Sequence, residues 1–198
     1  SSVTLGFRIS GVTTGDACGF AVGPAGDVNN DGIDDIIIGA PAASVTSKTY
    51  AGIVYVIYGR AVNPANDIAL SSVSGTSPLG FRVLGARASD YIGNSVAKTG
   101  DVNGDDIMDI IIGAASADSA TGVVDAGAAY VIFGKSVFSD IDLATMISGS
   151  STGFAIVGSS SYEYFGESVS AAGDINGDGL ADVVIGARQG DPAADRQN

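Results

Sequence analysis

Short apolar runs, each bounded by turn-forming residues, recur along the whole chain. The runs at residues 6–10, 20–26, 35–40 and 53–59 are rich in Ile, Val, Phe and Tyr, and Gly, Pro, Asn, Asp or Ser stand around them. Runs of this length and composition are typical of β-strands. The run at 35–40, DIIIGA, is continuously apolar, so we expect neighbouring elements to cover both of its faces. No segment keeps a helical period, and the pattern therefore predicts an all-β fold.

The same pattern occurs three times. Residues 6–41, 80–115 and 153–188 align almost without gaps, and the equivalent residues Asp27, Asp101 and Asp174 lie 74 and then 73 residues apart. A repeat of about four strands with a period above about 40 residues fits a blade of a β-propeller, with a β-solenoid as the competing architecture. We predict a partial propeller of antiparallel four-stranded blades with about two and a half repeats. Its single domain would span residues 1–198, with repeats at about 6–79, 80–152 and, truncated, 153–198.

Each repeat contains an acidic loop, D-x-N-x-D-x-x-x-D, directly before its DIIIGA-type strand. In a tight loop the side chains at positions 1, 3 and 5 can turn oxygens toward one point, while position 7 can add its carbonyl and position 9 a carboxylate. Such hard oxygens suit Ca²⁺, and the loops hold no His or Cys for zinc or copper. We therefore predict about three Ca²⁺ sites. Their ligands are Asp27, Asn29, Asp31, Ile33 and Asp35; Asp101, Asn103, Asp105, Ile107 and Asp109; and Asp174, Asn176, Asp178, Leu180 and Asp182.

The alternative is that these loops are only good turn formers with solvated side chains. Against it, three carboxylates held close together repel one another unless a cation lies between them, and the pattern keeps one register in all three loops. The loops are not EF-hands, because position 12 is an isoleucine in each and strands flank them. Position 6, where the sharp turn favours a positive φ, is Gly32 or Gly179 in two loops but Asp106 in the second. We predict the second site to be the weakest.

Composition narrows the function classes. The net charge is −13, from 22 acidic residues against nine Lys and Arg, so we expect no nucleic-acid partner. No apolar stretch approaches the length of a membrane span, about 18–20 residues, so we expect no membrane insertion. The single cysteine, Cys18, is equivalent in the repeat alignment to Ile92 and Phe165. We therefore predict that Cys18 is a small, buried, apolar side chain.

The sequence gives little support for a catalytic function. The chain has no His, so Ser–His and Cys–His nucleophile systems are absent, and we predict that it is not an enzyme. Three further acids, Asp16, Asp90 and Glu163, recur in register across the repeats, which indicates a structural role rather than one unique active site.

The acidic loop and its flanks resemble the FG-GAP repeat of integrin α-subunit propellers and their bacterial relatives. The family signature joins Phe-Gly, the acidic loop, and an apolar strand that ends in Gly-Ala-Pro. Residues 165–166 carry the first element and residues 39–41 the last, while the other copies are substituted. The resemblance implies a propeller with Ca²⁺ in loops on one face. It also implies that residues 6–10 are the outer strand of a preceding blade, that 18–85 and 93–158 hold full blades, and that 166–187 holds half a blade.

These patterns favour a Ca²⁺-binding module that is extracellular or at the cell surface and serves adhesion or interaction with a protein or glycan ligand. The alternative is a non-catalytic accessory domain of a secreted hydrolase or lipase-like enzyme. A closed propeller needs at least about four blades. We therefore expect either a piece of a longer protein or self-association of copies through open blade edges.

Overall fold

The computed structural model describes residues 6–60, 67–146 and 150–190, and β-strands make up nearly all of its regular structure. The other residues of the predicted 1–198 domain lie outside this description. The only helix among the described residues is the single 3-10 turn η1 (Leu70–Ser72), and no helix there is long and apolar enough to cross a membrane. The strands are β1 (Ile9–Ser10), β2 (Val22–Gly26), β3 (Asp35–Ala40), β4 (Ile53–Ile57), β5 (Ile68–Ala69), β6 (Gly80–Leu84), β7 (Ser95–Gly100), β8 (Asp109–Ala114), β9 (Ala128–Ile132), β10 (Ile141–Asp142), β11 (Gly153–Val157), β12 (Phe165–Gly173) and β13 (Asp182–Ala187).

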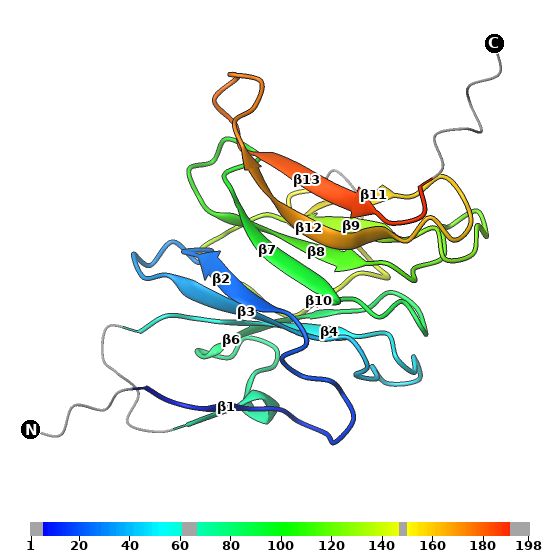
Figure 1. Ribbon diagram of the computed structural model, residues 1–198. Coiled ribbons are helices and arrows are strands. Elements are labelled where there is room, and N and C mark those ends of the chain that lie inside the picture. The colour runs from blue at the N-terminus through cyan, green and yellow to red at the C-terminus, as the bar shows by residue number, and fades with distance from the viewer. Residues whose placement is uncertain (1–5, 61–66, 147–149, 191–198) are drawn as a thin grey trace, which may run out of the picture.

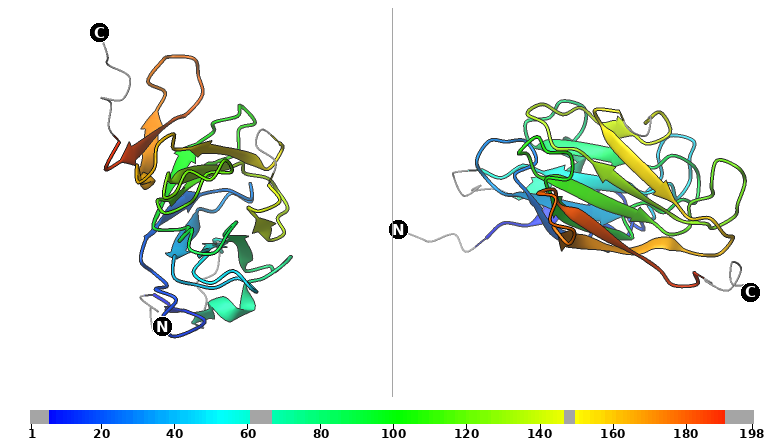
Figure 2. Two further views of the ribbon diagram at one scale, coloured as in Figure 1. Left: turned by 90° about the vertical axis from the view of Figure 1, so that its right-hand side faces the viewer. Right: turned by 90° about the horizontal axis from the view of Figure 1, so that it is seen from above.

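The strands form a stack of separate sheets (Figure 1). The first sheet has the order β10-β6-β4-β3-β2, the second β11-β9-β8-β7, and the third holds only β12 and β13. Figure 2 shows the same stack from two further directions, and the described sheets do not close into a ring. The prediction of an all-β partial propeller is confirmed.

The four antiparallel strands of each full blade pair in the same order. Strand β3 pairs antiparallel with β4 through Ile36 and Ile57, and β8 pairs with β9 through the equivalent Ile110 and Ile132. The continuously apolar runs are covered on both faces, as expected, because β8 is buried at all six positions and β3 at five of six. In the third repeat, by contrast, β13 pairs only with β12, and its Val184 is 54% exposed.

A short parallel strand extends the blade beyond the predicted four. Strand β10 pairs parallel with the outer strand β6, and β5 pairs parallel with β1 in the same way. An Arg–Asp pair lies at each place, with Arg82 Nε 3.0 Å from Asp140 Oδ2 and Arg8 Nη2 2.8 Å from Asp67 Oδ2. The strand expected at 6–10 is observed only at Ile9–Ser10, because β1 has no described third strand on its other edge, whereas β6 has β4.

Glycine lets adjacent blades touch through their backbones. A Cβ placed on Gly39 at the end of β3 would overlap the carbonyl oxygen of Gly93 in the next blade, and a Cβ on Gly113 would overlap that of Gly166. Gly93 and Gly166 have φ of +85° and +86°, which glycine adopts without strain. Apolar side chains fill the space between the first two blades, where the stacked rings of Phe81 and Phe138 lie 3.9 Å apart.

Candidate metal centre

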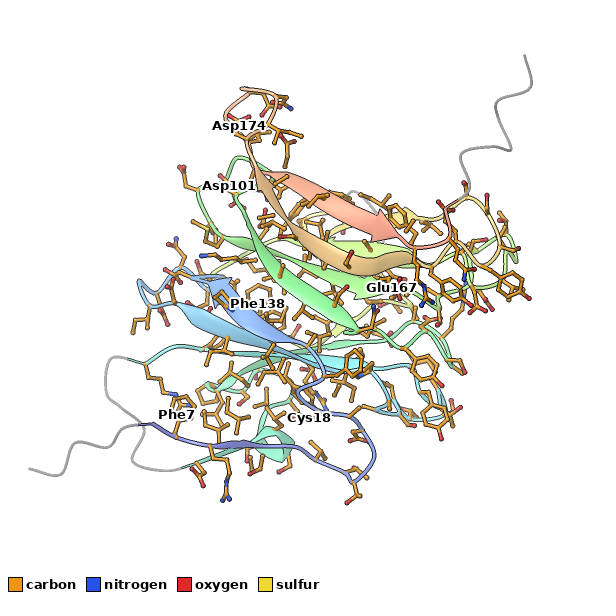
Figure 3. All side chains as sticks on the ribbon, viewed as in Figure 1. Phe7, Cys18, Asp101, Phe138, Glu167 and Asp174 are labelled. Carbon is orange, nitrogen blue, oxygen red and sulfur yellow. The ribbon has the colours of Figure 1, made fainter. Side chains whose placement is uncertain are left out.

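The three acidic loops all lie at the same end of the blades. The first acidic loop (residues 27–35) joins β2 to β3, the second (101–109) joins β7 to β8, and the third (174–182) joins β12 to β13. Figure 3 labels Asp101 and Asp174, the first residues of the second and third loops, at this end. Repetition of the blade therefore brings three copies of one oxygen-rich loop into a row.

The carboxylate at position 1 organises each loop. Its Oδ1 accepts the backbone N–H of position 5 and its Oδ2 that of position 6, so the loop wraps around this side chain. The bonds measure 2.9 and 2.7 Å to Asp27, 3.2 and 2.7 Å to Asp101, and 3.1 and 2.9 Å to Asp174. Because the three loops share these two hydrogen bonds, the motif forms the same turn in each repeat.

Positions 3 and 5 add oxygens to the same turn. The side-chain carbonyl of the position-3 asparagine accepts the N–H of position 5 at 3.0, 3.1 and 2.8 Å in the three loops. The asparagine amide in turn donates to Oδ2 of the position-5 aspartate at 2.9, 3.0 and 3.0 Å. The position-5 Oδ1 accepts the N–H of position 7, which is Ile33, Ile107 or Leu180. The structure thus brings together the side chains predicted at positions 1, 3 and 5.

The aspartate at position 9 has backbone partners of its own. Asp35 is 2% exposed, and its two oxygens accept the N–H of Val28 at 3.0 Å and of Gly59 at 2.8 Å. Asp109 is fully buried and does the same with Val102 and Gly134, at 2.8 and 2.7 Å. In each of these two blades, the two hydrogen bonds attach the acidic loop to the end of the third strand. We call this pair of hydrogen bonds the clasp.

The third copy of this clasp is incomplete. Asp182 accepts the N–H of Ile175 at 2.9 Å and has no described third strand behind it. The sequence prediction missed the glycine partners Gly59 and Gly134, although each is the second-to-last residue of one of two similar runs, AGIVYVIYGR at 51–60 and AGAAYVIFGK at 126–135. A Cβ on either glycine would overlap the acidic loop, so their recurrence was a usable signal.

Burial and hydrogen bonding shift the pKa values of the loop acids in opposite directions. Loss of solvation raises the pKa of Asp35 and of Asp109 to about 6, against the pull of their backbone donors. At Asp101 desolvation is the largest single effect and acts upward, but four backbone N–H donors together outweigh it and lower the pKa. The pKa of Asp174 is lowered chiefly by the N–H of Gly179. The backbone donors therefore favour the charged form of Asp101 and of Asp174.

Left-handed backbone is required at positions 4 and 6. In the third loop both are glycine, Gly177 and Gly179, with φ of +78° and +88°. The first loop has Asn30 at position 4 with φ +58°, and the second has Asp106 at position 6 with φ +64°. Asn and Asp tolerate this region better than other side chains, at some cost. The predicted weakness of the second site thus has a counterpart in backbone strain, while its Ca²⁺ affinity stays a prediction.

The donor set of each loop suits a hard divalent cation. Three carboxylates, one amide oxygen and the position-7 carbonyl supply only oxygen, and oxygen ligands are what Ca²⁺ prefers. Among residues 6–60, 67–146 and 150–190, no three acidic or Cys side chains converge closely enough to form a ready cation cage. In the first two loops, backbone N–H groups donate to both oxygens of the position-9 carboxylate.

The other recurring acids cap turns. Asp90 is 3% exposed, and its Oδ2 accepts the N–H of Arg87 at 2.8 Å. Asp16 accepts from Thr13 and Glu163 from Ser160 in the equivalent turns. Their repetition therefore has a structural basis. Cys18 is only half-buried and packs against the apolar cluster of the first blade, where burial and the nearby Asp16 raise the pKa of its thiol.

Known proteins share this arrangement of motifs. The model of the FG-GAP repeat family matches residues 19–57, 92–132 and 165–198. Phosphatidylinositol-glycan-specific phospholipase D of Dictyostelium discoideum is 32% identical over 181 residues, which cover 87% of this chain and 18% of that protein. Integrin alpha-4 of Xenopus laevis is 29% identical over 96% of this chain, and integrin alpha pat-2 of Caenorhabditis elegans is 31% identical over 91%. The chain spans less than one fifth of each of these relatives.

Proposed function

Because this chain belongs to the FG-GAP repeat family, we propose that it is an extracellular β-propeller module that binds Ca²⁺ and serves adhesion through a protein or glycan ligand. The observation that carries the proposal is the threefold recurrence of one oxygen-rich loop, with one hydrogen-bond pattern, at one end of the blades. The similarity to integrin alpha subunits supports the adhesive role.

The proposed ligands of each ion are the side chains at positions 1, 3, 5 and 9 and the carbonyl at position 7. The side chains at positions 1, 3 and 5 already share one turn, whereas the position-9 carboxylate would keep its clasp while offering its remaining lone pairs. A bound ion supplies two positive charges that offset the repulsion between the carboxylates. The module then holds the entry of each DIIIGA-type strand in place and has no catalytic role of its own.

Calorimetric titration of the purified chain with CaCl₂ tests the ion. We expect about three sites, and loss of one site in each variant that removes two carboxylates of one loop, such as Asp174→Asn with Asp178→Asn. A matched control, Asp16→Asn with Asp118→Asn, makes the same charge change in loops at the other end of the blades and should keep all sites. A chain that binds no Ca²⁺ contradicts the proposal.

The adhesive role needs its own test. A labelled chain applied to a glycan array and to a panel of extracellular-matrix proteins should bind specific members in CaCl₂, and EDTA should release it. If Ca²⁺ binds but no glycan or protein on either panel is retained, the adhesive part of the proposal is wrong.

A second candidate function is an accessory, non-catalytic domain of a secreted lipase-like enzyme. The observation that favours it is the similarity to phosphatidylinositol-glycan-specific phospholipase D over 87% of the chain. The arrays separate the two functions, because an accessory domain of such an enzyme should select phosphatidylinositol-linked glycans over matrix proteins.

A further inference from the structure

Adjacent acidic loops are connected by hydrogen bonds, and the connection between the first and second runs through the 134–135 peptide and both position-9 carboxylates. The N–H of Val28 donates to Asp35 Oδ2 at 3.0 Å, and the carbonyl of the same Val28 accepts the N–H of Lys135 at 2.9 Å. Lys135 follows Gly134, whose N–H donates to Asp109 Oδ1 at 2.7 Å. Three hydrogen bonds, one between backbone groups and two to side-chain carboxylates, therefore link Asp35 to Asp109.

The second and third loops contact each other directly. The N–H of Ala181 donates to the carbonyl oxygen of Asp101 at 2.8 Å. Ala181 is position 8 of the third loop, between the proposed ligands Leu180 and Asp182, and Asp101 is position 1 of the second. The Leu180 side chain also leans over the second loop, because its Cδ2 would lie 3.3 Å from a Cβ on Gly104.

One packing contact is common to both junctions. The side chain at position 8 of each later loop covers the glycine that precedes the acidic loop of the repeat before it. Met108 lies over Gly26, with its Cγ 3.0 Å from where a Cβ would be, and Ala181 lies over Gly100, with its Cβ at 2.8 Å. Neither glycine can gain a side chain without moving its neighbour. The loops are thus packed in series along the stack.

From these contacts we infer that the three loops bind Ca²⁺ with positive cooperativity, each loaded loop raising the affinity of the loop beside it. The inference rests on the proposed function, since it concerns the same ions. An ion fixes the backbone of its loop, and the fixed backbone holds Ala181 or the Gly134–Lys135 peptide in place against the next loop. That loop then loses less conformational entropy when its own ion binds. Ala181 and Lys135 are positioning residues in this account.

The sign of the effect separates packing from simple electrostatics. A bound divalent cation repels a second cation at a neighbouring site, so charge alone makes the binding anticooperative. Contact through ordered backbone makes it cooperative. The two causes therefore predict opposite departures from independent binding.

The experiment is a CaCl₂ titration of the whole chain, followed by the amide NMR signals of Gly32, Gly104 and Gly179, one glycine for each loop. We expect Hill coefficients above 1. In the variant with Asp174→Asn and Asp178→Asn, the midpoint at Gly104 should rise about fivefold, a typical size for coupling between sites. The control with Asp16→Asn and Asp118→Asn carries the same charge change and should leave the Gly104 midpoint unchanged.

A second variant addresses the contact itself. Ala181→Pro removes the N–H that Asp101 accepts and should lower the Hill coefficient at Gly104 toward 1, whereas Ala181→Gly keeps the N–H and should keep the coupling. Hill coefficients of 1 or below, with an unchanged Gly104 midpoint in the third-loop variant, overturn the inference and leave the proposed function standing. If no glycine signal responds to Ca²⁺, the proposed function itself fails. Should the proline variant not fold, the third-loop variant decides alone.

Discussion

The second and third acidic loops have the same D-x-N-x-D-x-x-x-D pattern but very different surroundings. Asp109 of the second loop is fully buried and accepts two backbone N–H groups, one of them from Gly134 after the third strand of its blade. Asp182 of the third loop is half-exposed, accepts one N–H, and has no described third strand behind it. The motif alone therefore shapes the turn at positions 1 to 6, while the rest of the blade determines how firmly the loop is fixed to the fold.

Substitution of the two position-9 acids should show the largest contrast. Asp109→Ala leaves the N–H groups of Val102 and Gly134 buried without partners and should lower the free energy of unfolding by about 4 kcal/mol, at about 1–3 kcal/mol for each group. Asp182→Ala should cost about 1 kcal/mol, because the one donor it leaves, the N–H of the largely exposed Ile175, regains water. Urea unfolding in EDTA measures both. Equal losses would mean that the clasp does not distinguish the two loops.

The glycines at the ends of the same strands should differ next. A Cβ on Gly113 would overlap the backbone of Gly166 in the next blade, whereas a Cβ on Gly186 would meet mainly the hydroxyl of Ser168, which can rotate away. We expect Gly113→Ala to destabilise the chain by about 3 kcal/mol and Gly186→Ala by less than about 1 kcal/mol. Thermal unfolding compares the pair. A loss of stability below about 1 kcal/mol for Gly113→Ala would show that the blades are not in backbone contact.

The burial of carboxyl groups inside the full blades should also affect how the stability of the chain depends on pH. Burial raises the pKa of Asp90 to about 6, although the N–H and charge of Arg87 act in the opposite direction. An acid with a raised pKa binds its proton more tightly in the folded chain, so the free energy of unfolding should fall as the pH rises from about 4 to about 6 and then level off. Asp35 and Asp109 share this raised pKa and contribute to the same slope.

Asp90→Asn isolates one part of that slope. It should flatten the fall between pH 4 and pH 6 by about 1–2 kcal/mol, measured by urea unfolding in EDTA across this range. The asparagine oxygen can still accept the N–H of Arg87, so the turn itself should survive. A slope identical to that of the unsubstituted chain would mean that Asp90 is solvated in the fold.

Exchange of the position-6 residues should have the smallest effect. Asp106→Gly relieves a left-handed backbone at φ +64° and should stabilise the second loop by about 0.5 kcal/mol, while Gly179→Asp imposes the same conformation on the third and should destabilise it by a similar amount. Both values come from urea unfolding. If position 6 sets the weakness of the second site, Asp106→Gly should also tighten its Ca²⁺ binding, read from the Gly104 amide. Opposite signs would exclude backbone strain as the cause.

The elements that follow local patterns could be predicted from the sequence. The strand at 35–40 was predicted with the observed bounds, because Asp35 and the five apolar residues after it lie between clear turn-forming residues. The left-handed backbone at position 6 of the loops also followed from the residue types present. Parallel strands β5 and β10 were missed, because two residues carry no periodicity and their partners lie about 60 residues away in sequence. The recurring pairs Arg8–Asp67 and Arg82–Asp140 were the available sign.

The limits of the site prediction have a similar cause. The sequence shows which oxygens are near one another along the chain, and the side chains at positions 1, 3 and 5 do meet. The partners of the position-9 carboxylates, Gly59 and Gly134, are 24 and 25 residues further on and depend on how the third strand ends. The predicted ligand roles therefore remain predictions, and the clasp is what the structure adds to them.

Thermal unfolding of the chain in excess CaCl₂ and in EDTA tests the central claim most directly. Binding to the folded state alone adds about 2.7 kcal/mol per site at a hundredfold excess over Kd. Three such loops should raise Tm by about 10 °C or more in CaCl₂, and the variants that empty one loop should raise it less. An identical Tm in CaCl₂ and EDTA would contradict the account.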